Sequence, residues 1–143
     1  MFLGEYQHTL DEKGRIAIPS KFRSALKGGA VVTRGLDGSL IVYALQELKV
    51  LAQKLAALPI SQHNSRAFAR LMLAGAMDVG IDNQGRMAIP EYLRQYANMT
   101  KQVVVAGLYN RLELWDTETW TRYKSKTELA SADIAEQLGE LGI

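Results

Sequence analysis

A thirteen-residue segment occurs twice in this chain, and the repeat constrains the fold more than any other feature of the sequence. The first copy is DEKGRIAIPSKFR at residues 11–23, and the second is DNQGRMAIPEYLR at residues 82–94. Asp, Gly, Arg, Ala, Ile, Pro and Arg recur in register at an offset of 71 residues, about half of the 143-residue chain. Such a mixed match is improbable by chance, so the chain is an internal duplication.

The similarity extends beyond these thirteen residues. At the same offset residues 1–4 align with 72–75, and after one inserted residue 31–36 align with 103–108 and 40–43 with 112–115. The alignment predicts a first unit at 5–47, connecting helices at 48–75, a second unit at 76–119 and a C-terminal helical segment at 120–143.

Each unit is expected to consist mainly of short strands. The run at 15–18 is extended and ends at Pro19, because a residue before proline is biased away from helix. The segments 11–14 and 82–85 are predicted turns in which glycine supplies a positive φ. Asp37-Gly38 predicts a hairpin between the strands on either side of it, and Asn110 takes the corresponding position in the second unit.

Helices are expected to follow the strands. Leu48, Leu51, Leu55 and Leu58 form an apolar stripe over residues 46–58, which end at Pro59. Further helices are predicted over 61–74 with Phe68, Leu71 and Met72 facing inward, after the N-cap pair Asp116-Thr117, and weakly over 131–138. Trp115, Trp120 and Tyr123 are expected in the core or at a subunit interface.

An Asp followed four residues later by an Arg has a direct structural interpretation. The two side chains can form a charge-assisted hydrogen bond across the turn and so fix the loop that leads into the strand. Asp11, Gly14, Asp82, Gly85 and Arg86 are therefore predicted to be structural. Spacing alone leaves open whether the two aspartates do more than form a stable corner.

The two copies of the motif differ in charge. Residues 11–27 hold five basic and two acidic side chains, a net charge of +3, whereas residues 82–98 hold two of each and are neutral. A duplicated scaffold does not require excess charge on one copy, so the excess indicates an anionic partner, of which nucleic-acid phosphate is the commonest. The first motif is the better candidate for DNA contact, and the second for a scaffold or subunit interface.

Several classes of protein are not supported by the sequence. There is no cysteine, and no carboxylate cluster near His8 or His63 completes a metal site. Motifs for a nucleophile, a zinc protease or a phosphate loop do not occur, so we expect no enzyme, metal or cofactor. No apolar run reaches eighteen residues and the N-terminus does not look like a signal peptide, so we expect neither a membrane span nor secretion.

The paired Asp-x-x-x-Arg motifs, each followed by Ala-Ile-Pro, resemble the MraZ family. The start MFLGE and the segment WDTETW at 115–120 add to the likeness, which covers nearly the whole chain. Each unit is similar to the swapped-hairpin β-domain of the AbrB/SpoVT type. The resemblance implies an α+β fold, mainly β, in which two tandem swapped-hairpin units form one pseudo-dimeric β-barrel with flanking helices.

The resemblance also implies a function. Family members are bacterial transcriptional regulators that bind short direct repeats of double-stranded DNA ahead of the division and cell-wall (dcw) gene cluster, which includes their own gene. They commonly repress it, associate with the nucleoid in the cytoplasm, and assemble into ring-shaped, octamer-like homo-oligomers without a cofactor. By motif match the DNA-binding arginine falls on Arg15, with Lys13, Lys21 and Arg23 as neighbours.

One other class of function stays open on the residues alone. The chain could be an interaction module, either an oligomeric scaffold whose basic face binds an acidic protein or an antitoxin-like protein that binds a toxin. Antitoxins of this fold usually have one unit and a disordered tail, whereas this chain has two units and no long polar tail. Tight, salt-sensitive and sequence-selective DNA binding would distinguish a regulator from a scaffold.

Overall fold

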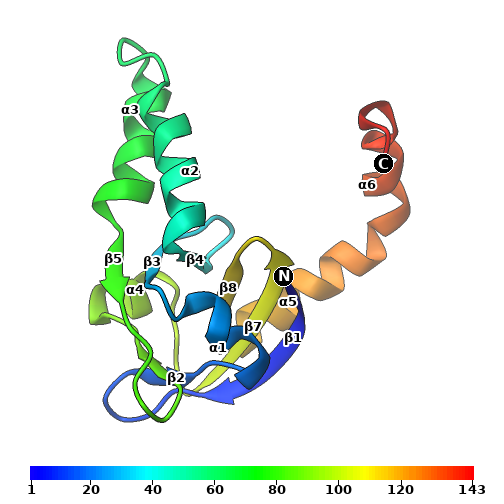
Figure 1. Cartoon of the computed structure of the whole chain (residues 1–143). Helices are drawn as coiled ribbons and strands as arrows, with labels where there is room; N and C mark the ends of the chain where they lie inside the picture. Colours follow the sequence, from blue (N-terminus) through cyan, green and yellow to red (C-terminus); the bar gives the residue numbers. More distant parts are fainter.

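The two repeats fold by exchanging strands. In the computed structural model, which describes all 143 residues, a six-stranded antiparallel sheet lies beside a two-stranded ribbon, and two helical arms extend from the sheet (Figure 1). The elements are β1 (Phe2–Thr9), β2 (Arg15–Ala17), α1 (Ser20–Leu26), β3 (Ala30–Arg34), β4 (Leu40–Ala44), α2 (Leu45–Ala56), α3 (His63–Ala69), η1 (Arg70–Ala74), β5 (Met77–Val79), β6 (Arg86–Ala88), α4 (Glu91–Tyr96), β7 (Gln102–Tyr109), β8 (Leu112–Asp116), α5 (Thr117–Leu129), α6 (Ser131–Gln137) and η2 (Gly139–Leu141).

The strand order in the main sheet is β1-β7-β8-β4-β3-β5. The repeat alignment matches β1, β3 and β4 with β5, β7 and β8, so the order is the same from either edge once the units are interchanged. The first strand of each unit pairs with a strand of the other unit, β1 with β7 and β5 with β3, and β4 pairs with β8 at the centre. Each repeat completes its sheet only with a strand from the other.

The sheet is open, with β1 and β5 at its edges, so the closed barrel expected from the resemblance is wrong for the main sheet. The reason lies at the start of the second repeat. Residues 72–75 align in sequence with 1–4, but Met72 to Ala74 lie in the π-helical turn η1, whereas Phe2 to Gly4 lie in β1. Strand β5 is therefore three residues long and β1 is eight. The α+β class with two repeats is confirmed.

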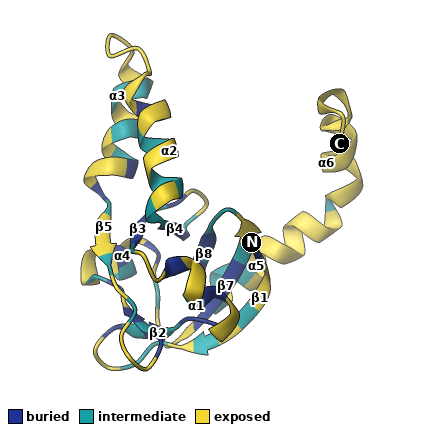
Figure 2. Ribbon diagram, viewed as in Figure 1, coloured by how far each residue is buried: buried dark blue, intermediate teal, exposed yellow.

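The main core lies where one face of the sheet packs against the ribbon and the short helices α1 and α4. Ile16 and Met87 of the ribbon are fully buried there, as are Phe22 of α1 and Leu93 of α4. These residues form the like-for-like pairs of the duplicated motif. Figure 2 shows the buried residues concentrated in this body and the exposed residues on the arms. The repeat is therefore preserved at the positions that fill the shared core.

The two arms extend from the sheet in similar directions (Figure 1). The first arm comprises α2, α3 and η1, and its lower part packs against the second face of the sheet, where Leu55 and Met72 contact Ile41 and Tyr43. The second arm comprises α5, which begins at the predicted N-cap Asp116, then α6 and η2. Neither α5 nor α6 contains a buried residue. None of the helices combines the length and the apolar character needed to cross a membrane.

One local prediction was wrong. Phe68 was expected to face inward, but this residue is 36% exposed, because only the part of the arm nearest the sheet packs against the sheet. In the second unit the turn between β7 and β8 falls at Asn110 as predicted, and the positive φ of +64° lies on the preceding residue, Tyr109. The first hairpin turns at Asp37-Gly38 as predicted, with φ values of +63° and +86°.

Because the repeats share one core, a destabilising substitution in the first repeat should also destabilise the second. We expect Ile16→Ala to lower the free energy of unfolding by about 2–5 kcal/mol through the cavity it leaves. Both tryptophans, Trp115 and Trp120, lie in the second half of the chain. In urea unfolding, tryptophan fluorescence and far-UV circular dichroism should therefore shift together to lower denaturant. Val50→Ala, at an exposed position of α2, is the control and should change stability by about 0.5 kcal/mol or less. Separate transitions for the two signals would contradict the shared core.

Candidate nucleic-acid interface

The ribbon β2–β6 has an apolar face and an arginine face. Ile16 lies opposite Met87 in the antiparallel register, and Arg15 and Arg86 lie opposite Ala88 and Ala17. Since side chains alternate between the faces of a strand, Ile16 and Met87 point into the core and the two arginines point away from it. Each arginine side chain is 28% exposed. Two repeat-related arginines therefore stand together on the outer face of one short ribbon.

The turn before each ribbon strand is held by its aspartate. One carboxylate oxygen of Asp11 accepts hydrogen bonds from the backbone N–H groups of Lys13 and Arg15, both at 2.9 Å, and the other accepts from Arg15 Nε at 2.7 Å. Asp82 repeats this pattern with the N–H groups of Gln84 and Arg86, at 2.9 Å each, and with Arg86 Nε at 3.1 Å. The predicted Asp–Arg pairing across both turns is confirmed.

The two arginines differ in their remaining contacts. Arg86 Nη1 also lies 3.7 Å from Oδ2 of Asp11, so Arg86 contacts the aspartates of both turns. Arg15 is held by Asp11 through Nε, and its terminal Nη groups make no hydrogen bond within the chain. Arg15 thus has a fixed orientation and free donors. The chemistry favours it over Arg86 as the group that contacts a ligand.

The last arginine of each motif packs on the glycine turn of the other repeat. Arg23 Nε donates to the carbonyl of Ile18 at 2.8 Å, and Arg94 Nε donates to that of Ile89 at 2.9 Å. A Cβ on Gly14, whose φ is +74°, would lie 2.8 Å from Cζ of Arg94. Glycine is therefore needed both for the turn and for this close approach.

A Cβ on Gly85 would likewise collide with the Arg23 guanidinium. Arg23, predicted to contact DNA, thus has a structural contact that sequence reasoning missed. The recurrence of Arg at positions 23 and 94 was the available signal.

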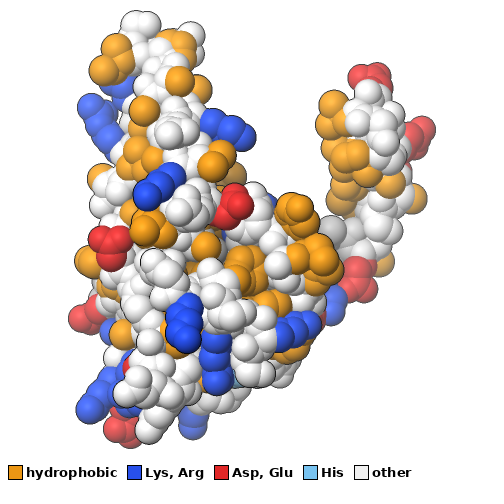
Figure 3. All heavy atoms as spheres, viewed as in Figure 1, with side chains coloured by type: hydrophobic (Ala, Val, Ile, Leu, Met, Phe, Trp, Pro, Cys, Tyr) orange, Lys and Arg blue, Asp and Glu red, His pale blue; other side chains and the backbone are white.

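The other predicted basic residues lie around the same end of the molecule. Lys13 is exposed on the first turn, and Lys27 joins Arg23 in lining a groove of about 630 Å³ between α1 and the second turn. Lys21 points toward β1, with Nζ 4.9 Å from the centre of the Tyr6 ring. Figure 3 shows Lys and Arg side chains over the surface around α1 and the turns. Of these residues, Lys13 lies on the turn that leads into β2, Arg23 and Lys27 lie beside the second turn, and Lys21 lies against Tyr6 of β1.

The environment of the turns lowers the pKa of Asp11 and Asp82. For Asp11 the largest cause is the hydrogen bond from the backbone N–H of Arg15, and for Asp82 it is the one from the backbone N–H of Arg86. The arginine side chains lower both values further. His8 on β1 also has a lowered pKa, chiefly through burial and then through the charge of Arg23. No group of three His, Asp or Glu side chains is placed to hold a metal ion.

The chain is similar to known proteins over its full length. The model of the MraZ protein family, which carries an antitoxin-like description, matches residues 1–71 and again residues 72–140. Proteins named transcriptional regulator MraZ from Clostridium acetobutylicum and Halothermothrix orenii are each 48% identical to it. One of the same name from Thermoanaerobacter pseudethanolicus is 46% identical. Each alignment spans 143 residues and 100% of both chains. The two family matches divide the chain where the repeat offset does.

The lowered pKa values predict a pH dependence of stability. In the folded state both carboxyl groups have a pKa below the unfolded value of about 3.9. Their contribution is therefore present above pH 4 and is lost as the pH falls through the folded-state pKa. We expect the free energy of unfolding to drop in this acid range. Urea unfolding at several pH values from 3 to 5 gives the free energy of unfolding as a function of pH. This free energy should change less steeply with pH in the Asp11→Asn/Asp82→Asn double variant than in the unaltered chain.

Glu12→Gln provides the control, because the Glu12 carboxylate makes no hydrogen bond or ion pair and lies on the same turn as Asp11. Its slope should match that of the unaltered chain. Equal slopes for the double variant and the unaltered chain would show that the turn carboxylates do not contribute to acid sensitivity.

Proposed function

This chain belongs to the MraZ family, and we propose that it is a sequence-specific DNA-binding transcriptional regulator. Its proposed target is the promoter of its own gene and of the dcw cluster, which it represses from short direct repeats. The proposed location is the bacterial cytoplasm, in association with the nucleoid. The names of the relatives, transcriptional regulator MraZ, support the regulatory class.

The observation that best supports DNA binding is the arginine face of the ribbon. The major groove of B-DNA admits a two-stranded β-ribbon, and an arginine can donate two hydrogen bonds to O6 and N7 of guanine. Arg15 has free terminal donors, and Asp11 fixes its orientation in advance. In this proposal Arg15 contacts a base, while Lys13, Lys21 and Arg23 contact phosphates and set the position of the protein.

The strand exchange supports a further proposal about how the chain is built. Two tandem units, residues 5–47 and 76–119, take the place of the two chains of a dimer, with 48–75 as connecting helices and 120–143 as a C-terminal segment. The palindromic strand order is what such a pseudo-dimer requires. Arg86, which contacts both aspartates, fits a scaffold role in the second unit.

Multivalent binding would make short sites sufficient. We propose a ring-shaped, octamer-like homo-oligomer whose subunits each engage one direct repeat. Once one subunit has bound, the next contact is effectively intramolecular, and avidity can exceed the single-site affinity by about 100-fold to 10,000-fold. Subunits on one face of a ring can reach successive repeats only if these lie on the same side of the duplex, about one helical turn apart.

The repeat-related arginines offer a matched pair of variants. Arg15→Ala should abolish promoter binding and leave the oligomer intact, because a bidentate arginine–guanine contact is worth about 1–3 kcal/mol at every engaged subunit. Arg86→Ala should weaken binding less or disturb assembly. Gel-shift titrations against promoter and scrambled DNA measure the binding, and size-exclusion chromatography measures the assembly. If Arg15→Ala dissociates the oligomer, Arg15 is a structural residue and not a DNA contact.

Repeat spacing tests the multivalent mechanism separately. DNA with repeats about 10 bp apart should bind far more tightly than DNA with the same repeats about 15 bp apart, because half a helical turn places alternate sites on the opposite side of the duplex. Titration at two salt concentrations should show weaker binding at the higher one. Equal and weak binding to both spacings and to scrambled DNA would favour the alternative of a basic scaffold for an acidic protein.

A further inference from the structure

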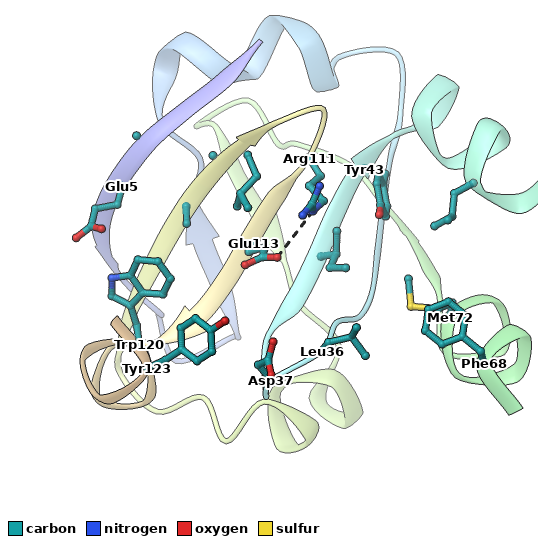
Figure 4. A pocket seen from close by; sticks show the side chains of 16 residues that line it. Glu5, Leu36, Asp37, Tyr43, Phe68, Met72, Arg111, Glu113, Trp120 and Tyr123 are labelled. Atoms are coloured by element: carbon teal, nitrogen blue, oxygen red, sulfur yellow. Dashed lines mark ion pairs between the residues drawn. The ribbon is translucent and has the colours of Figure 1, made fainter. Parts of the chain in front are cut away.

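The second face of the sheet forms the floor of an apolar trough between the two arms (Figure 4). The trough has a volume of about 660 Å³. Phe68 and Met72 of the first arm line one side, and Trp120 and Tyr123 of α5 line the other (Figure 4). The trough therefore presents apolar and aromatic walls.

The outer part of the second arm, residues 129–143, is called the C-terminal arm here, and its apolar side chains are not covered by the rest of the chain. Every residue from 131 to 143 is exposed, and Leu129 is 91% exposed. Ile134, Leu138 and Leu141 recur at helical spacing and form an apolar stripe along α6 and η2. Figure 3 shows apolar side chains on the side of this arm that faces the gap between the arms. A seven-residue helix is marginal in water on its own, so α6 requires a packing partner.

The C-terminal arm and the first arm carry opposite charges. From residue 127 to the C-terminus there are four acidic side chains and no basic one: Glu128, Asp133, Glu136 and Glu140. The first arm, residues 45–74, has four basic side chains, Lys49, Lys54, Arg66 and Arg70, and a single acidic one. Within the trough the acidic groups Glu5 and Glu113 are paired with Lys124 and Arg111, at 3.1 and 3.8 Å, and Asp37 lines it without an ion pair.

We propose that the C-terminal arm of one copy docks into the trough of a second copy of this chain. The arm cannot readily fill its own trough, because α6 follows α5 after the single residue Ala130 and α5 itself forms one wall. Docking would bury the stripe of α6 and place acidic side chains beside the basic first arm. Such a head-to-tail contact can be repeated from copy to copy until it closes a ring. This contact, called the joint below, would be the interface between neighbouring subunits of the proposed oligomer. In that respect the inference rests on the proposed function.

Two variants that each disable one half of the joint provide the test. Ile134→Asp/Leu138→Asp disables the arm, and Phe68→Asp disables the trough. In multi-angle light scattering the unaltered chain should have a mass that is a multiple of 15.9 kDa, whereas each variant alone should have the monomer mass of 15.9 kDa. An equimolar mixture of the two should form a 1:1 pair and stop there, because one intact arm and one intact trough remain. Circular dichroism should show unchanged secondary structure, since the altered positions are exposed.

Ile60→Asp is the matched control. Ile60 lies between α2 and α3, is 83% exposed and belongs to neither surface, so this variant should keep the mass of the unaltered chain. The proposal is overturned if the unaltered chain is a monomer, if the arm variant keeps the full mass, or if the two monomeric variants fail to pair. An arm that folds back onto its own chain would give the first of these results.

DNA titration separates this inference from the proposed function. The monomeric arm variant retains Arg15 and should bind a single repeat as tightly as the unaltered chain. It should lose the gain on tandem repeats, on the order of 100-fold or more. If no variant binds DNA but the mixing experiment succeeds, the regulatory function fails and the joint stands. If single-repeat binding is normal but mixing fails, the joint fails and the function stands.

Discussion

The structure depends on backbone pairing between the two repeats at the ribbon. Beyond the pairs of β2 and β6, the N–H of Ile18 donates to the carbonyl of Gly85 and that of Ile89 donates to the carbonyl of Gly14, each at 2.9 Å. These bonds join the end of each strand to the turn of the other repeat. Because the same turns are held by Asp11 and Asp82, a local carboxylate cluster and a long-range sheet contact stabilise one another. Neither repeat has a complete core without this region.

The part of the site that could be predicted from the sequence is the part that acts over a few residues. Asp11 bonds groups two and four residues ahead, so spacing alone indicated the contact. Strand exchange could not be derived in this way, since Phe2 lies opposite Tyr109 and no local signal identifies a partner so distant. The swap was expected only from the resemblance to a family. The contact between Arg94 and Gly14 was missed for the same reason, because it crosses the repeats.

The open edge of the sheet shows how chain context overrides sequence similarity. Residues 2–4 lie in strand β1, whereas residues 72–74 lie in the π-helical turn that directly continues the helix begun at His63. Helix propagation is favourable once a helix exists, and no proline or glycine interrupts this one before Gly75. Phe68 shows in the same way that the position of a residue in the sequence pattern does not by itself determine its burial. Its spacing from Met72 places it on the same side of the arm, but the sheet covers only Met72.

The difference in charge and contacts between the two turns has a consequence for the kind of DNA site that suits this fold. Two identical chains related by a two-fold axis present the same surface twice and match a palindrome. Here the units share a scaffold, but Arg15 contacts one carboxylate whereas Arg86 contacts two, and the positive excess belongs to the first unit alone. Fusion into one chain has therefore given a symmetric framework a direction. In the proposed function, such a directional surface would match sites that all point the same way along the duplex and would distinguish a tandem array from an inverted one.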